Sequence, residues 1–381
     1  MDNSFNHYIL GVFVSLFLAV LLFTKKGKST ADLILGIWLL MIGFHIWMFS
    51  GFINNQIDKY PHLLGISLIM PFLHGPLLFY YIVALTKPQD LNFKLFFTHA
   101  ALPVIILFLD LPFFMLESKE KIFVFKNSGK GFENAVLISH ILLTISGLIY
   151  LFLNFKLLNE HKKRVLAQFS NQENINLNWL RILIYMMAVI WIFIIFSESD
   201  PWIFSLSSIY VVVLGYFGIN QVGIFTNKSL ALESVNNSEV IEDIEPTEEK
   251  KKYAKSGLTE DVAISLHENL KSLMQEKQLF KEAELTLVEL ANNLNVHPNY
   301  LSQVINEKEG INFYDYINGL RVEEFKRLLL LPENQKYTII ALAYECGFNS
   351  KSAFNRIFKK HTNLSPTEYM KEQGIKNIKD L

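Results

Sequence analysis

The chain has 381 residues, a formal net charge of −1 at pH 7, and hydrophobic residues at 51% of its positions, among them 32 Phe. A soluble two-domain protein is rarely so apolar, and the single cysteine excludes a disulfide framework. The excess of apolar residues is concentrated in residues 1–224, where apolar blocks alternate with short polar loops.

Seven of these blocks are long enough, or nearly long enough, to cross a bilayer. They are Tyr8–Phe23, Leu33–Phe52, Leu63–Leu85, Phe97–Leu116, Val136–Phe155, Trp179–Phe196 and Trp202–Ile219. The first block is not a signal peptide, because its positive cluster, Lys25 to Lys28, follows the apolar run and no small-residue cleavage site closes it. We predict a seven-transmembrane-helix module over residues 1–224.

The distribution of lysine and arginine predicts the orientation of this module. Loops after the first, third and fifth blocks carry nine of these residues, against five in the loops after the second, fourth and sixth. Positive loops stay on the cytoplasmic side. The N-terminus is therefore predicted to lie outside, and seven crossings place the C-terminus in the cytoplasm.

His45, His74 and His140 are ionisable residues inside the apolar blocks. Ionisable residues within a span are costly and suggest function, so these are predicted intramembrane sensing residues. The alternative is that they are neutral and hydrogen-bonded between helices. Pro71 and Pro76 bracket His74, which predicts a kinked helix and indicates a cavity at this point.

After the apolar region the composition changes sharply. Residues 225–256 are acidic from Glu233 to Glu249 and then basic at Lys250 to Lys252, which predicts a solvated, flexible linker. A helical pattern follows from Gly257 to Phe280. This helix could pack on the segment after it or pair with a second chain, and the sequence leaves both open.

The last part of the chain contains the same apolar pattern twice, and each copy predicts a helix, a tight turn and a second helix. The four apolar residues of each first helix have the spacing 3-1-3, and Asn295 or Gly347 follows as the turn residue. We predict helix-turn-helix units at 286–306 and 338–361, joined by one helix at 312–331. The paired patterns are Leu287, Leu290, Ala291, Leu294 and Ile339, Leu342, Ala343, Cys346.

Helix caps support these boundaries. Thr286 and Glu289 form a capping-box pattern, and Thr338 and Asn349 are the expected caps of the two helices in the second unit. Cys346 occupies the same repeat position as Leu294, so it is predicted to be a small core residue.

The segment Leu287–Glu372 closely resembles the DNA-binding domain of AraC/XylS-type transcription regulators. The resemblance is carried by LTLVELANNLNVHPNYLSQVI, FYDYINGLRVEEFKRLL and TIIALAYECGFNSKSAFNRIFKKHTNLSPTEYMK. Two residues depart from the family pattern: Phe325 replaces a small residue, and Asn363 replaces glycine before the Leu-Ser-Pro turn. Since Asn tolerates a positive φ, we expect local repacking with the fold retained. The resemblance implies a bacterial inner membrane and double-stranded DNA as a partner.

In a helix-turn-helix the exposed residues at the start of the second helix meet base edges in the major groove. The predicted base-reading residues are Asn299, Tyr300, Ser302 and Gln303 in the first unit and Ser350, Lys351, Ser352, Asn355 and Arg356 in the second. Lys359, Lys360 and His361 are the predicted phosphate contacts. Each polar side chain could instead touch only water or phosphate. A homodimer would lengthen the DNA site.

Together these features predict an all-α, multi-pass inner-membrane protein whose cytoplasmic domain regulates transcription. The membrane module is predicted to sense an unidentified small-molecule or membrane signal. The alternatives are that the module only anchors the chain, or that it is a transporter or enzyme domain fused to a regulator. The stretch from Lys156 to Asn178 could couple the two parts or lie on the membrane surface. No metal-ligand spacing, phosphate loop or catalytic arrangement is present in the sequence, so we predict no cofactor, no metal and no enzyme activity.

Overall fold

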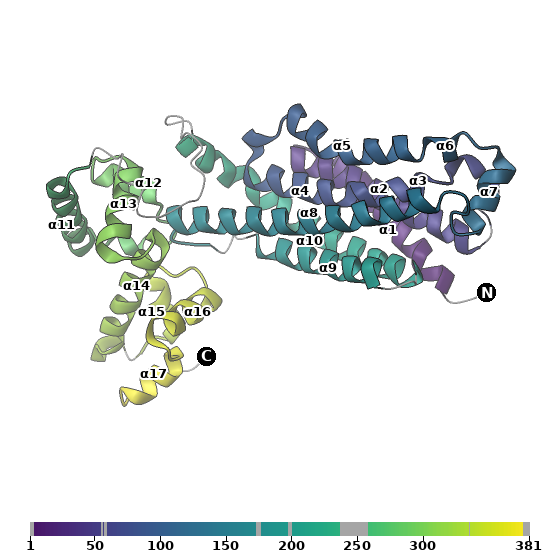
Figure 1. The fold of residues 1–381 in the computed structure, drawn as a ribbon. Coiled ribbons are helices and arrows are strands. Elements are labelled where there is room, and N and C mark those ends of the chain that lie inside the picture. Colours follow the sequence, from purple (N-terminus) through teal and green to yellow (C-terminus); the bar gives the residue numbers. More distant parts are fainter. Residues whose placement is uncertain are drawn as a thin grey trace. The chain divides into compact units, whose positions relative to one another are not determined.

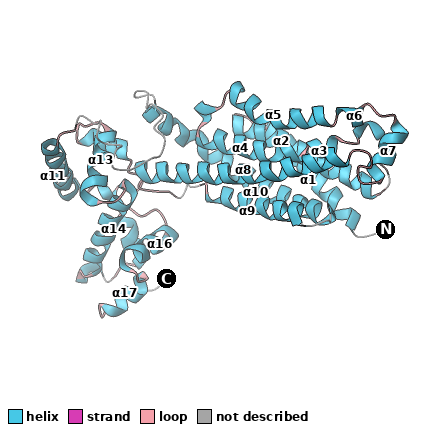
Figure 2. Ribbon diagram, viewed as in Figure 1, coloured by secondary structure: helices cyan, strands magenta, loops and turns pink. Residues whose placement is uncertain are grey.

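The computed structural model describes residues 4–54, 56, 59–172, 177–196, 200–236, 258–334 and 336–375. Within these ranges every regular element is a helix (Figures 1 and 2), apart from an isolated bridge between Phe169 and Thr286. Contacts divide the chain into two units. The N-terminal unit comprises Met1–His161 and Leu177–Ser229, and the C-terminal unit comprises Lys162–Asn176 and Leu230–Leu381.

All seven predicted apolar blocks fall on helices of the N-terminal unit. These helices are α1 (Ser4–Thr24), α2 (Thr30–Ile53), α3 (Ile66–Ile69), α4 (Pro71–Thr86), α5 (Phe93–Leu109), α6 (Leu111–Phe114), α8 (Glu133–Gln168), α9 (Asn178–Phe196) and α10 (Asp200–Asn236), with the polar α7 (Ser118–Lys126) between α6 and α8. The fourth block, predicted as one helix, is divided between α5 and α6 at Asp110.

Among the described residues, four helical segments could cross a membrane by length and hydropathy: α2, α8, α9 and Asp200–Gly218 of α10. The pair Pro61–Ile69 and Pro71–Thr86 would be a fifth span, bent by 50° at the break. The bend agrees with the predicted kink, because Pro71 starts a new helix there. The remaining apolar helices, Tyr8–Thr24 and Phe96–Leu109, are shorter. The helical architecture is thus confirmed, whereas the prediction of seven spans stays a prediction.

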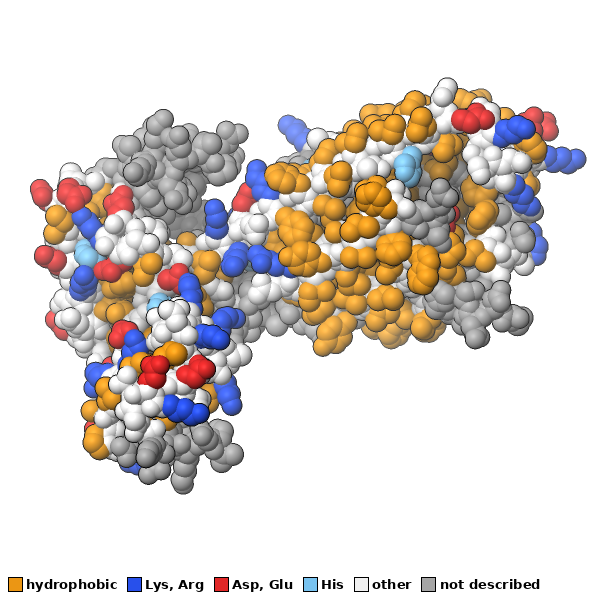
Figure 3. Space-filling model, turned by 60° about the horizontal axis from the view of Figure 1, so that its bottom comes forward, with side chains coloured by type: hydrophobic (Ala, Val, Ile, Leu, Met, Phe, Trp, Pro, Cys, Tyr) orange, Lys and Arg blue, Asp and Glu red, His pale blue; other side chains and the backbone are white. Residues whose placement is uncertain are grey.

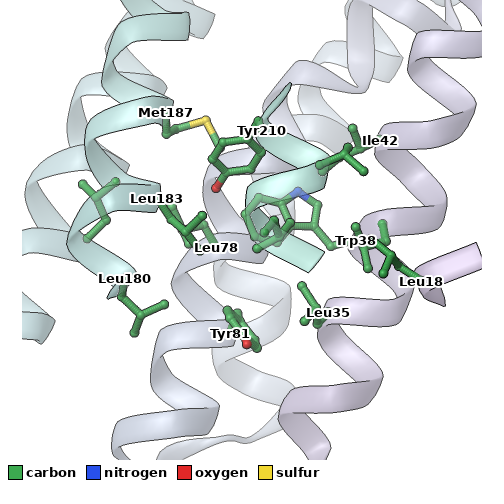
Figure 4. Close-up of a cluster of buried hydrophobic side chains, with 14 of the residues drawn as sticks. Leu18, Leu35, Trp38, Ile42, Leu78, Tyr81, Leu180, Leu183, Met187 and Tyr210 are labelled. Carbon is green, nitrogen blue, oxygen red and sulfur yellow. The ribbon is translucent and has the colours of Figure 1, made fainter. Parts of the chain in front are cut away.

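The apolar interior of the N-terminal unit is built around large side chains of α2, α4, α9 and α10 (Figure 4). Trp38 is fully buried and meets Tyr210 edge to face, with 5.9 Å between ring centroids. Gly147 of α8 lies beneath the Trp191 ring of α9, where a Cβ would come within 2.4 Å of the indole. A small residue is needed there because it lets the two helices approach closely.

Hydrophobic side chains cover much of the face of the N-terminal unit that Figure 3 shows. Phe13, Phe108, Phe152 and Phe196 are 65%, 68%, 68% and 82% exposed. An apolar surface of this extent is unfavourable in water and marks a surface that contacts lipid or protein.

The C-terminal unit consists of α11 (Glu260–Lys277), α12 (Leu287–Asn293), α13 (Pro298–Glu309), α14 (Phe313–Leu329), α15 (Ile339–Glu345), α16 (Lys351–Thr362) and α17 (Pro366–Glu372). The predicted helix-turn-helix pairs are found as α12–α13 and α15–α16, and α14 joins them as predicted. Helix α11 packs on the first pair: Ala263 and Leu266 contact Val304. This is the first of the two alternatives for that helix.

Two expectations about core residues are confirmed. Cys346 is fully buried in the core of the second pair, and burial raises the pKa of its thiol to about 12. Phe325 lies in the same core, where its ring centroid is 4.7 Å from that of Phe354 and 5.5 Å from that of Phe358. Asn363 has a φ of 61° and ends α16, so it takes the positive φ that was expected to be tolerated at this position.

The predicted linker is corrected in part. Residues 225–236 belong to α10 and are helical, because the acidic composition begins only at Glu233 and nothing before it breaks a helix. Residues 237–257, which hold most of the acidic and basic charge, lie outside the described residues.

Candidate nucleic-acid interface

The two helix-turn-helix pairs have the same turn. After α12, Asn295 has a φ of 54°, and the amide of Val296 donates to the carbonyl of Ala291 at 3.0 Å. After α15, Gly347 has a φ of 91°, and the amide of Phe348 donates to Ala343 at 3.1 Å. A left-handed residue followed by this backward hydrogen bond satisfies the end of the first helix and redirects the chain into the second.

Gly347 is expected to be irreplaceable at its turn. A Cβ there would lie 2.7 Å from the carbonyl oxygen of Lys281 and 2.8 Å from that of Phe280, which are backbone atoms and cannot rotate away. We expect Gly347→Ala to lower the free energy of unfolding of the C-terminal unit by about 2 kcal/mol. Hydrogen exchange of α15 and α16 amides measures the effect, and Gly310→Ala is the control. Gly310 also has a positive φ, 70°, but a Cβ there meets no atom within 4 Å. Equal effects of the two substitutions would contradict the backbone clash.

The caps agree with the sequence in all but one case. Thr286 and Glu289 form the predicted capping box, and Thr338 caps α15. The cap of α16 is Ser350, whose hydroxyl accepts from the amide of Ala353 at 3.1 Å. The prediction that Asn349 caps this helix is wrong, because its amide group donates instead to the carboxylate of Glu284.

Helix α13 is the first recognition helix, which means the helix of its pair that is predicted to meet base edges. Its predicted base-reading residues differ in exposure. Asn299 and Tyr300 are exposed, and Ser302 is half-buried. Gln303 is only 5% exposed, so the prediction that it is an exposed base-reading residue is wrong. Its side chain runs along the helix and donates to the carboxylate of Glu307, one turn further on, at 3.1 Å. The helical periodicity of α13 does not place position 303 on the buried face. The long side chain of Gln303 is nevertheless covered, because it lies along the helix.

Sequence reasoning missed His297 in this helix. Its ring nitrogen accepts from the amide of Asn299 at 3.2 Å, which makes His297 the cap of α13, and its ring lies edge to face with Tyr300. The signal was present in the sequence, because Pro298 in the first helical turn marks the residue before it as the cap.

In the second recognition helix, α16, one face is buried and the opposite face carries the predicted residues. Ala353, Phe354, Ile357 and Phe358 are buried. Lys351, Ser352, Asn355 and Arg356 are exposed, whereas Ser350 is half-buried and engaged as the cap. An amphipathic helix with polar groups on its free face has the shape and chemistry to enter a major groove.

Comparisons with known proteins agree with this geometry. Residues 290–372 match the family model described as helix-turn-helix domain. The chain is 34% identical over 88 residues to the uncharacterized HTH-type transcriptional regulator YijO of Escherichia coli K12, covering 23% of this chain and 30% of that protein. Residues 290–372 are an AraC-type helix-turn-helix domain.

Two further likenesses concern the same share of the chain. The uncharacterized HTH-type transcriptional regulator YobQ of Bacillus subtilis 168 is 36% identical over 85 residues, which are 22% of this chain and 34% of that protein. A solved structure of a protein of unknown function from Listeria innocua is 30% identical and covers 28% of this chain and 95% of its own, with a TM-score of 0.25. This chain thus spans about a third of the length of each of these two HTH-type regulators.

The three residues of the AraC-type domain that are predicted to contact phosphate differ in their charge and in their ion pairs. Lys359, Lys360 and His361 are all exposed, but Lys360 forms an ion pair with Asp315 of α14 at 2.6 Å. Burial lowers the pKa of His361, so this ring carries little positive charge at neutral pH. Of the three, Lys359 is thus the side chain best suited to contact a phosphate.

A buried arginine joins α14 to the segment before α12 and to the residue Ser170 after α8. Arg321 of α14 is 2% exposed, and its guanidinium donates to the carbonyl oxygens of Phe280 and Glu282, each at 2.7 Å. It also donates to the hydroxyl of Ser170 at 3.1 Å. Burial lowers the pKa of Arg321 to about 10, so the side chain remains charged at neutral pH.

The end of α8 and the residues after it are part of this unit. Ser170 is 1% exposed; its amide donates to Leu285 at 3.2 Å, and its carbonyl accepts from the amide group of Asn318 at 3.0 Å. Asn171 donates to Glu284 at 2.8 Å, and Glu284 also accepts from Asn349 just before α16. No local pattern in the sequence predicts these contacts: Asn171 and Glu284 are 113 positions apart, and Ser170 and Asn318 are 148 positions apart.

The predicted intramembrane histidines do not form one cluster. His45 and His74 are neighbours: Trp38 donates to Nδ1 of His74 at 3.2 Å, and Nε2 of His74 lies 3.3 Å from Nδ1 of His45. His140 is exposed on α8 and does not line the pocket beside the other two. Among the described residues, no group of three or more His, Cys, Asp or Glu could hold a metal ion.

Proposed function

We propose that this chain is a membrane-anchored, one-component transcription regulator of a bacterial inner membrane. In this proposal the AraC-type domain binds double-stranded DNA in the cytoplasm, with α13 and α16 in successive segments of the major groove. The observation that carries it is the exposed polar face of α16, opposite a fully packed apolar face, in a domain whose relatives are transcriptional regulators.

The surface of the N-terminal unit supports the membrane part of the proposal. Large aromatic and aliphatic side chains are exposed along α1, α5, α8 and α9, at a cost that lipid would remove. The excess of lysine and arginine in alternate loops favours an outside N-terminus and a cytoplasmic C-terminal domain.

The path of α8 supports a regulatory link over a passive anchor. Its residues up to His161 belong to the N-terminal unit, and those from Lys162 belong to the C-terminal unit. There the chain is packed into the DNA-binding unit, because Phe169 and Ser170 are buried and Ser170 is bonded to Arg321 and Asn318. A passive tether would need no such contacts.

A footprint on genomic DNA tests the DNA-binding part. The full-length protein, purified in lipid nanodiscs, is expected to protect discrete sites with two contacted segments about one helical turn apart. Binding that is sensitive to salt but shows no preferred sites would overturn the proposal.

A double substitution tests the regulatory link. We expect Phe169→Ala with Ser170→Ala to lower the affinity of the full-length protein for its site about tenfold, since the buried Phe169 ring and the Ser170 hydroxyl that accepts from Arg321 are both removed. Lys163→Ala, at an exposed position of the same helix end, is the control and should leave the affinity unchanged. If the double variant binds like the parent protein, α8 is only a tether and the anchor-only alternative holds.

A further inference from the structure

A pocket in the N-terminal unit lies beside the two paired histidines. It is lined by residues of α2, α4, α9 and α10, most of them apolar: Ile42, His45, Ile46, His74, Met187, Ile190, Phe204, Ser207 and Tyr210. His45 and His74 are half-buried, whereas Tyr210 is 2% exposed. The polar groups of this pocket decide what it can bind.

The hydrogen-bond chain fixes the protons on both histidines. An indole N–H can only donate, so Nδ1 of His74 accepts from Trp38 and carries no proton. The proton of His74 is therefore on Nε2, which donates to Nδ1 of His45. His45 in turn carries its proton on Nε2. The chain of three rings thus ends in a donor on His45, and no hydrogen bond from that nitrogen is found within the described ranges.

A second donor in this pocket is unsatisfied. The hydroxyl of Tyr210 is buried and has no hydrogen-bond partner among the described residues. Ser207 adds no free donor, because its hydroxyl already donates to the carbonyl of Ile203 at 2.8 Å. A buried hydroxyl without a partner is costly, which indicates that a further group completes this site.

The charge of the pocket narrows the choice of ligand. No Lys, Arg, Asp or Glu among the described residues lines it. An anionic group such as a carboxylate would have no positively charged partner in this apolar bundle. A cationic group would be unfavourable too, because the pocket offers it two hydrogen-bond donors and no negative charge. A neutral acceptor, by contrast, satisfies both donors at no charge cost, and the space of about 40 Å³ beside the rings is sufficient for a carbonyl group.

We propose that this pocket binds the carbonyl group of a neutral, membrane-soluble molecule, such as a ketone, lactone or quinone. The carbonyl oxygen accepts from Nε2 of His45 and from the hydroxyl of Tyr210, and the apolar part of the ligand contacts Ile42, Ile190 and Phe204. The inference rests on the proposed function in one respect only: this ligand would be the signal that the membrane module senses.

Thermal unfolding of the full-length protein in nanodiscs tests the site. The probes are 2-undecanone, γ-undecalactone and duroquinone, with undecane as the apolar control. At saturating concentration at least one carbonyl probe is expected to raise the Tm of the N-terminal unit by about 2 °C or more beyond undecane. If none of the three exceeds undecane, the site does not bind carbonyl compounds and the proposal fails. Water would then be the remaining partner of Tyr210.

Two matched variants locate the effect. Tyr210→Phe removes an unpartnered hydroxyl, so without ligand its Tm should equal or exceed that of the parent protein, while the carbonyl-specific shift disappears. Tyr81→Phe is the control, because Tyr81 also has a buried, unpartnered hydroxyl but does not line the pocket, and the shift should persist. Loss of the shift in both variants, or in neither, would overturn the assignment.

The same preparations separate this inference from the proposed function. The footprint on DNA is repeated with and without the effective probe. A carbonyl-specific shift in Tm without any change in the footprint would leave the binding site standing and overturn its role as the signal. A regulator that footprints its sites but shows no carbonyl-specific shift would keep its function and lose this ligand class.

Discussion

Arg321→Ala is expected to lower the free energy of unfolding of the C-terminal unit by about 3–5 kcal/mol. The substitution removes the donors to the carbonyl oxygens of Phe280 and Glu282, and each buried acceptor left without a donor costs about 1–3 kcal/mol. The truncated side chain also leaves a cavity beside α14. A loss of about 1.4 kcal/mol raises the equilibrium constant for unfolding tenfold. Amides that exchange through unfolding of this unit should therefore exchange at least about a hundredfold faster.

A surface residue of the same helix provides the control. Glu323 is 69% exposed and pairs with Lys326, so Glu323→Ala should change the unfolding free energy by less than about 1 kcal/mol. Hydrogen exchange followed by mass spectrometry on the full-length chain compares the two variants. Similar exchange rates in both would show that the contacts of Arg321 do not hold the unit together.

Arg356→Ala is expected to weaken binding to the specific DNA site by about tenfold to a hundredfold and to relax the preference at one base position. Arg356 is exposed on α16, and a bidentate arginine–guanine pair contributes about 1–3 kcal/mol of discrimination. Competition footprints with all four bases at each position of the site measure the change.

Lys359→Ala separates base reading from phosphate binding. A phosphate contact carries no sequence information, so this variant should bind all sequences more weakly by a similar factor, with a salt dependence reduced by about one contact. If Arg356→Ala has that uniform effect instead, Arg356 contacts the backbone and α16 does not read guanine through it.

Much of the fold could be predicted from the sequence because its signals are local. The 3-1-3 spacing defines the faces of α12 and α15, and Asn295 and Gly347 supply the positive φ that each turn needs. Apolar blocks likewise predicted the helices of the N-terminal unit. Where a boundary depended on one residue, the prediction was less secure: Ser350 caps α16 although Asn349 was an equally good candidate by type.

The candidate sites were predictable in composition and less so in detail. Periodicity placed Lys351, Asn355 and Arg356 correctly on the exposed face of α16. It failed for Gln303, since the position of a Cβ on a helix does not fix where a long, flexible side chain ends. The histidines were identified from the sequence as polar residues in apolar blocks. The sequence did not predict that His45 and His74 are neighbours and that His140 lies apart from them.

By itself the sequence determined the helices, the duplicated helix-turn-helix and the residue types on the recognition helices, because each depends on neighbours within a few turns. Tertiary structure decided that His45 joins His74 and not His140, and that Ser170, 151 positions before Arg321, is part of the C-terminal unit. Those choices depend on which helix faces meet in space. A periodic pattern specifies whether a helix face is apolar or polar, but it does not specify which other face that helix packs against. Only the tertiary structure shows the face against which it packs.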